Sequence, residues 1–192
     1  DIAAAKGYGS ANLDNEATFY LDKNGMIVAV GNVSENAYNY ALVMAKGSSI
    51  DERVKVALPD GTTGTYTLTP SGNGKKLADV EVGTVYAYSI NSDKEIKLTA
   101  ASGGVAKNNA TFTKGKTSVG ADSMTTVYTN KNTAFYYTAD AATADADKGV
   151  ISEVNVYTGY NNAPSLKSTS NATVEVYTSG TRVVAVVFTG SD

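Results

Sequence analysis

The chain has 192 residues, a net charge of −3 and a pI near 5.0, with 42% hydrophobic and 18% charged residues. This is enough apolar material to bury a core, and the low charge content excludes disorder driven by charge repulsion. The acidic balance and the absence of a Lys/Arg cluster argue against nucleic acid as a partner. Cys and His are both absent, which excludes disulfides, thiolate nucleophiles, Cys-ligated metals and His-dependent catalytic triads.

Two features of the chain bear on targeting. No apolar run reaches the length of about 18 residues that a membrane-spanning helix needs, so no span is expected. The chain opens with DIAAAKGYGS instead of a signal peptide, which indicates a mature or excised segment.

The first part of the chain contains a lead-in segment and a hairpin. Residues 1–16 are rich in Ala, Gly and Asn and have no clear period. TFYLDKNGMIVAV, residues 18–30, alternates on both sides of a DKNG turn, which predicts a β-hairpin. The Asp22 carboxylate should accept a backbone N–H in this turn, and Gly25 can adopt a positive φ. Alternation from Tyr38 to Met44 then predicts one more strand.

Two further hairpins follow. RVKVALPDGTTGTYTLT turns at Pro59-Asp60-Gly61, where Pro presets φ and Gly supplies the left-handed residue. GTVYAYSINSDKEIKLTA, residues 83–100, turns at Asn91–Lys94. Three hairpins and one extra strand are sufficient for a small barrel or sandwich.

The glycine-rich stretch 101–110 is the expected domain boundary. Beyond it, residues 125–139 predict a fourth hairpin around Asn130–Asn132, and SEVNVYTGY predicts a strand. The chain closes with ATVEVYTSGTRVVAVVFTG, a hairpin expected to turn at Ser179-Gly180. Val183–Phe188 is almost continuously apolar, so this last strand should be covered on both faces.

These patterns predict an all-β protein. The expected organisation is two small barrel-like or sandwich-like domains built from consecutive β-hairpins. The lead-in would cover residues 1–16, the N-terminal domain residues 17–101 and the C-terminal domain residues 102–192.

One acidic loop is a candidate calcium site. Asp140, Asp145 and Asp147 precede Gly149 and place oxygen ligands at alternating positions, as calcium loops do. The loop departs from the EF-hand pattern, because Lys148 stands where a ligand is expected and no closing Glu follows. A solvated acidic loop is the favoured interpretation, calcium is the alternative, and no other cofactor is expected.

Tyrosines are the candidate ligand-binding residues, since 13 Tyr occur against 4 Phe and no Trp. A sugar-stacking surface could use Tyr and its wet hydroxyl, but in sheets Tyr also commonly fills space between strands. The filler role is the favoured interpretation. The candidates for the stacking role are Tyr86, Tyr88, Tyr157 and Tyr160, with Tyr136 and Tyr137 beside them.

Paired carboxylates could hydrolyse glycosides without His. Asp79 with Glu81, and Asp93 with Glu95, each share a strand face because they lie two residues apart. Both pairs flank turns, where acidic residues are common, so solvated turn residues are the favoured interpretation and no enzymatic activity is expected.

Several phrases together resemble a known family. TFYLDKNGMIVAV, YALVMAKG, VKVALPDGT, GTVYAYSINSDKEIKLT, TTVYT and VNVYTGYNNAPSL, in this order, resemble the β-rich region of surface proteins from Gram-positive, Clostridia-like bacteria that carry S-layer homology domains. The S-layer homology domains themselves are not recognisable here. The resemblance implies a secreted, cell-wall-associated protein of which this chain is a presented segment, and it supplies no catalytic residues.

The expected function is therefore a non-catalytic spacer module of an extracellular bacterial surface protein. Its partners would be neighbouring domains of the same protein. The alternative is a module that binds cell-wall polysaccharide or a host ligand through surface tyrosines.

Overall fold

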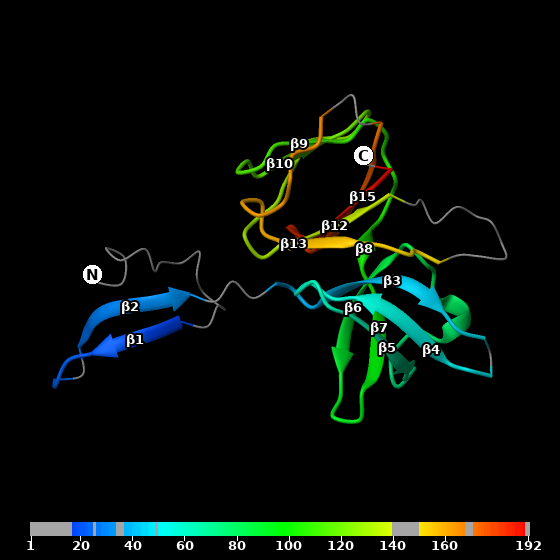
Figure 1. Cartoon of the computed structure of the whole chain (residues 1–192), viewed down its shortest axis with the longest axis horizontal. Coiled ribbons are helices and arrows are strands. Elements are labelled where there is room, and N and C mark those ends of the chain that lie inside the picture. The colour runs from blue at the N-terminus through cyan, green and yellow to red at the C-terminus, as the bar shows by residue number, and fades with distance from the viewer. Residues whose placement is uncertain are drawn as a thin grey trace. The chain divides into compact units, whose positions relative to one another are not determined.

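The computed structural model describes residues 17–24, 26–33, 37–48, 50–139, 150–167 and 171–190. Apart from one 3₁₀ turn, η2 (Leu77–Asp79), the regular structure of these residues is β-strand, which confirms the predicted all-β class (Figure 1). The chain divides into two compact units, residues 1–36 and 37–192. The strands are β1 (Ala17–Leu21), β2 (Ile27–Val33), β3 (Tyr40–Lys46), β4 (Arg53–Ala57), β5 (Thr63–Leu68), β6 (Val85–Ile90), β7 (Glu95–Ala100), β8 (Ser102–Gly103), β9 (Thr111–Phe112), β10 (Ser118–Gly120), β11 (Val127–Tyr128), β12 (Ala134–Thr138), β13 (Asn155–Thr158), β14 (Thr173–Ser179) and β15 (Arg182–Thr189).

The first unit contains the predicted N-terminal hairpin. Strand β1 pairs antiparallel with β2, which confirms the hairpin. In its turn, the Asp22 carboxylate accepts the backbone N–H groups of Met26, at 2.9 Å, and Asn24, at 2.8 Å. These hydrogen bonds favour the charged form and lower the pKa of Asp22. The lead-in segment 1–16 and Gly25 lie outside the described residues.

Strands β3 to β7 close a five-stranded barrel in the order β3-β4-β5-β7-β6. Strand β6 returns to pair with β3, and all neighbours are antiparallel except β5 and β7, which are parallel. Counted from β3, this is a Greek-key order 1-2-3-5-4, the arrangement of an OB-type barrel. The predicted strand near Tyr40 and both hairpins that follow are confirmed.

The turn between β4 and β5 has the predicted chemistry. The Asp60 carboxylate accepts the Thr62 backbone N–H at 2.9 Å and its hydroxyl at 2.7 Å, and Gly61 has φ +87°. Few residues other than Gly adopt this φ. The barrel interior is filled by inward-facing residues of all five strands, together with Leu58 after β4, Leu77 of η2 and Val80 after η2. These are Ala41, Val43, Val54, Val56, Leu58, Leu68, Leu77, Val80, Tyr86, Ile96 and Leu98.

A five-stranded sheet follows, in the order β13-β12-β15-β14-β8. Strand β15 lies between its antiparallel neighbour β14 and its parallel neighbour β12. Residues 183–188 are all buried, which confirms that this strand is covered on both faces. The final hairpin is also confirmed, but Ser179 pairs with Arg182, so its loop is Gly180–Thr181, one residue later than expected. Gly180 has φ +58°, which a type II′ turn requires at its first central position.

The predicted fourth hairpin is wrong. The turn itself is present, because the Asn130 side chain accepts the Asn132 backbone N–H at 2.8 Å. The strands on its two sides belong to different sheets, however: β11 pairs with β10, whereas β12 pairs with β13 and β15. All five β12 residues are buried, and burial in the central sheet outweighs the local tendency to fold back.

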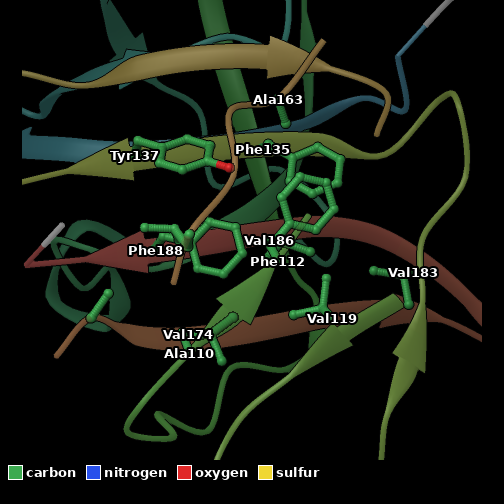
Figure 2. Close-up of a cluster of buried hydrophobic side chains, with 12 residues drawn as sticks. Ala110, Phe112, Val119, Phe135, Tyr137, Ala163, Val174, Val183, Val186 and Phe188 are labelled. Atoms are coloured by element: carbon green, nitrogen blue, oxygen red, sulfur yellow. The ribbon is translucent and has the colours of Figure 1, made fainter. Parts of the chain in front are cut away.

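The five-stranded sheet has a core on each face. On one face it packs against the small sheet β9-β10-β11, and Figure 2 shows the aromatic rings gathered there. The centroids of the Phe112 and Phe135 rings are 5.0 Å apart, as are those of Tyr137 and Phe188. On the other face the sheet packs against the barrel. The unit therefore has three layers: barrel, central sheet and small sheet (Figure 1).

The barrel and the central sheet share one core. Leu42 and Met44 point out of the barrel and are buried in the same cluster as Tyr136, Ile151 and Val187. The boundary predicted between residues 101 and 102 falls inside the compact unit 37–192, while β1 and β2 lie in the other unit. The predicted domain limits stay a prediction.

Candidate functional site

Tyr86 is placed inside the barrel. Only 4% of its surface is exposed, and its hydroxyl accepts the Glu81 backbone N–H at 3.0 Å. Burial raises the pKa of Tyr86. Its ring is therefore buried in the barrel core.

Tyr157 and Tyr160 pack against the core on the far side of the central sheet. The ring of Tyr157 meets Tyr137 edge-on, with centroids 5.6 Å apart, and the Tyr137 hydroxyl donates to the Pro164 carbonyl at 2.6 Å. Tyr86 and Tyr88 belong to the barrel core instead. The four predicted tyrosines therefore lie in two separate clusters.

Tyr88 has the surroundings closest to those of a binding residue. It is half-buried against the barrel core, together with Tyr66 of β5. Burial raises the pKa of Tyr88, and the Asp60 carboxylate and the Tyr66 hydroxyl raise it further. Tyr66 and Tyr88 are thus partly buried against the same core, and the Asp60 carboxylate acts on Tyr88 electrostatically. No sequence signal connects Tyr66 and Asp60 with Tyr88, because the two tyrosines share a core, and Asp60 acts on Tyr88, only when the barrel closes.

The expectation that each carboxylate pair shares a strand face is wrong: Asp79 ends η2 and Glu81 lies outside any strand, while Asp93 lies in the β6–β7 turn and only Glu95 belongs to a strand, β7. Asp79 and Glu81 are exposed. Asp93 is exposed as well, and the Glu95 carboxylate accepts the Asn91 side-chain N–H at 2.7 Å within the β6–β7 turn.

The predicted calcium ligands Asp140, Asp145 and Asp147 lie outside the described residues, so calcium binding stays a prediction. Within the part of the chain that the structure describes, no group of three or more Asp and Glu residues is placed to hold a metal ion.

A cleft of about 370 Å³ lies beside the η2 segment. One of its lining residues, Lys46, donates from its ammonium to the Val80 carbonyl at 2.7 Å, which ties the end of β3 to the segment that follows η2. This lysine therefore has a structural partner. The lining residues are Lys46, Gly47, Glu52, Lys76, Leu77 and Ala78.

The outward face of β4 and β5 is the surface that OB-type barrels use for oligonucleotides and oligosaccharides. Stacking of bases needs aromatic side chains on such a surface. The outward positions alternate with the buried ones and carry no aromatic residue. They are Arg53, Lys55, Thr63, Thr65 and Thr67; Ala57, on the same face, is fully buried in the core shared with the central sheet.

Hydrogen bonds join the barrel to the central sheet at several points. The Ile151 N–H donates to the Met44 carbonyl at 2.8 Å, and the Thr158 hydroxyl donates to the Pro59 carbonyl at 3.0 Å. The hydroxyl of fully buried Tyr136 donates to the Tyr40 carbonyl at 2.6 Å. These bonds and the shared core fix the two layers to each other.

A polar pair lies on the barrel-facing side of strand β14. The Tyr177 hydroxyl donates to the Glu175 carboxylate at 2.6 Å. Burial raises the pKa of Glu175, although the hydrogen bond from Tyr177 opposes the shift. Burial also raises the pKa of Tyr177, and the neighbouring carboxylate adds to this.

Comparison of the chain with models of protein families, with curated proteins and with solved structures finds no match. No helix in the described ranges is long and apolar enough to cross a membrane.

Proposed function

We propose that this chain is a non-catalytic structural module that holds neighbouring parts of a secreted bacterial surface protein at a fixed spacing. The setting on a bacterial surface rests on the sequence resemblance. The structural role rests on one observation, the continuous core between barrel and central sheet.

The shared core supports this role because it joins barrel and central sheet without a flexible linker between them. Leu42 and Met44 are buried against residues of β12 and β15, and backbone and side-chain hydrogen bonds cross the same interface. Domains joined by small polar interfaces move relative to each other, whereas a large apolar interface prevents this motion. A module built in this way keeps its length under thermal motion.

Distance measurements between spin labels test the proposal. The pair Ser92→Cys and Lys114→Cys spans barrel and small sheet at exposed positions, and the pair Ser71→Cys and Ser92→Cys, within the barrel loops, is the matched control. The chain has no other Cys, so labelling is specific. We expect the two distance distributions to be equally narrow. A broad or two-peaked distribution for the first pair alone would refute a rigid spacer.

Glycan binding is the second candidate, favoured by two partly buried tyrosines on the barrel core, Tyr66 and Tyr88, with the exposed Asp60 carboxylate acting on Tyr88. Half-buried phenol rings can stack on a sugar, and a carboxylate can accept hydrogen bonds from its hydroxyl groups. Calorimetric titration with neutral oligosaccharides tests it: Tyr88→Ala should abolish saturable binding, and Tyr128→Ala, an exposed tyrosine elsewhere, should leave it unchanged. No saturable binding by the wild-type chain would exclude this candidate.

A further inference from the structure

The segment that leads into the barrel is bonded directly to β12. The Tyr38 backbone N–H donates to the Asn132 carbonyl, just before β12, at 3.2 Å. Two residues later, the Tyr40 carbonyl accepts the Tyr136 hydroxyl at 2.6 Å. Tyr136 is fully buried, so this second bond is shielded from water.

The last strand leaves the unit at the opposite end of β12. Strands β12 and β15 run parallel, with Ala134 opposite Ala185 and Thr138 opposite Thr189. The Gly190 N–H then donates to the Thr138 carbonyl at 2.9 Å. The attachment at Asn132 and the departure at Gly190 are therefore separated by the length of the five-residue strand β12, about 16 Å at roughly 3.3 Å per residue.

This placement determines how the unit responds to a pull on the chain. A pull on residues 38 and 190 acts along the axis of β12 and β15 and loads their ladder at all positions together. Strand β15 is held by five residue pairs with β12 and seven with β14. Pulling from the adjacent ends of β14 and β15 would instead open the pairs one at a time, beginning at Thr173 and Thr189.

We infer that residues 38–40, β12 and β15 form a tension-bearing clamp, so that the module resists stretching along the chain as well as bending. The inference depends on the proposed function for its biological setting only. A chain that passes the spin-label test can still lack the clamp, so the two ideas fail separately.

Single-molecule pulling at constant force tests the direction of resistance in the full chain. Handles on Ala37→Cys and Ser191→Cys load the strands lengthwise, and handles on Thr173→Cys and Ser191→Cys peel β15 away from β14. We expect the folded unit to survive many-fold longer in the lengthwise direction at the same force. Equal lifetimes in the two directions, or an early step that releases the barrel alone, would overturn the clamp.

A pair of variants tests the path through β12. Tyr136→Phe and Tyr137→Phe each remove one 2.6 Å hydrogen bond to a backbone carbonyl and keep the ring, but only the first bond connects the incoming segment to β12. Loss of one such bond should shorten the lengthwise lifetime about fivefold for Tyr136→Phe.

The control variant Tyr137→Phe shows which result would contradict the inference. Tyr137→Phe should shorten the lengthwise lifetime no more than it shortens the peeling lifetime. If both variants change the two lifetimes alike, the load does not pass through the Tyr136 bond and the inference is wrong.

Discussion

Replacement of Leu42 by Ala tests whether barrel and central sheet unfold together. Leu42 lies on a barrel strand, but its fully buried side chain packs in the cluster shared with the sheet. Removing three carbon atoms costs about 0.8 kcal/mol each in transfer free energy, and the cavity left behind adds to this, for a total of about 3–4 kcal/mol. In a domain of about 150 residues, this should lower Tm by about 10 °C.

The assay is differential scanning calorimetry combined with hydrogen exchange read by peptide. Leu98→Ala, in the barrel interior, is the matched control because it removes the same atoms from an equally buried site. If the unit is cooperative, both variants shift one common transition, and exchange accelerates in barrel and sheet alike. Two transitions, of which Leu98→Ala moves only one, would refute the shared core as the source of rigidity.

Three further predictions concern single groups. Burial raises the pKa of Glu175 in the folded protein above the value in the unfolded chain. Glu175 therefore contributes its full stabilisation below the ordinary Glu pKa, and this stabilisation is lost as pH rises through the pKa of the folded protein. The Tm of Glu175→Gln relative to wild type should therefore rise with pH, and a constant difference would contradict this. Burial also raises the pKa of Tyr136 and Tyr137, so ultraviolet titration should show that these two phenols ionise only when the chain unfolds, and their ionisation in the folded protein at the ordinary Tyr pKa would count against their burial. Gly103 has φ +99°, and a Cβ there would collide with the Val176 carbonyl, whereas Gly180 has φ +58° and open space around it. Denaturant unfolding should show Gly103→Ala costing more than about 2 kcal/mol and Gly180→Ala about 1 kcal/mol, and equal costs would contradict the collision.

Local structure was predictable because its causes are local. The Asp22 and Asp60 carboxylates accept backbone N–H groups two residues further on, and Gly61 supplies a positive φ. Such bonds depend on a few neighbouring residues only, so the turns and the strands that flank them could be inferred from the sequence.

The partners of β12 could not be inferred. Its turn at Asn130 suggests pairing with the preceding strand, but its parallel ladder with β15 joins residues about 50 positions apart. An apolar run such as AFYYT indicates burial on both faces without identifying the neighbours.

The candidate site shows the same limit. Alternation placed Tyr86 and Tyr88 on one face of β6, and this was correct, since both contribute to the barrel core. A period of two gives the residues that share a face but does not show which face is inside. Here the inward face contains the tyrosines, while Val85 packs outward against the central sheet.

The position of β15 also determines when this unit can fold. A ribosome completes residues 182–189 only after β12 and β14 have been made, yet β15 lies between these two strands. Until then the central sheet lacks its middle strand, and Leu42 and Met44 lack the surface that covers them. The barrel strands can pair early, but the three-layer unit must assemble after synthesis of the last strand, and a chain shortened before Val183 would leave the outer wall of the barrel exposed and prone to aggregation.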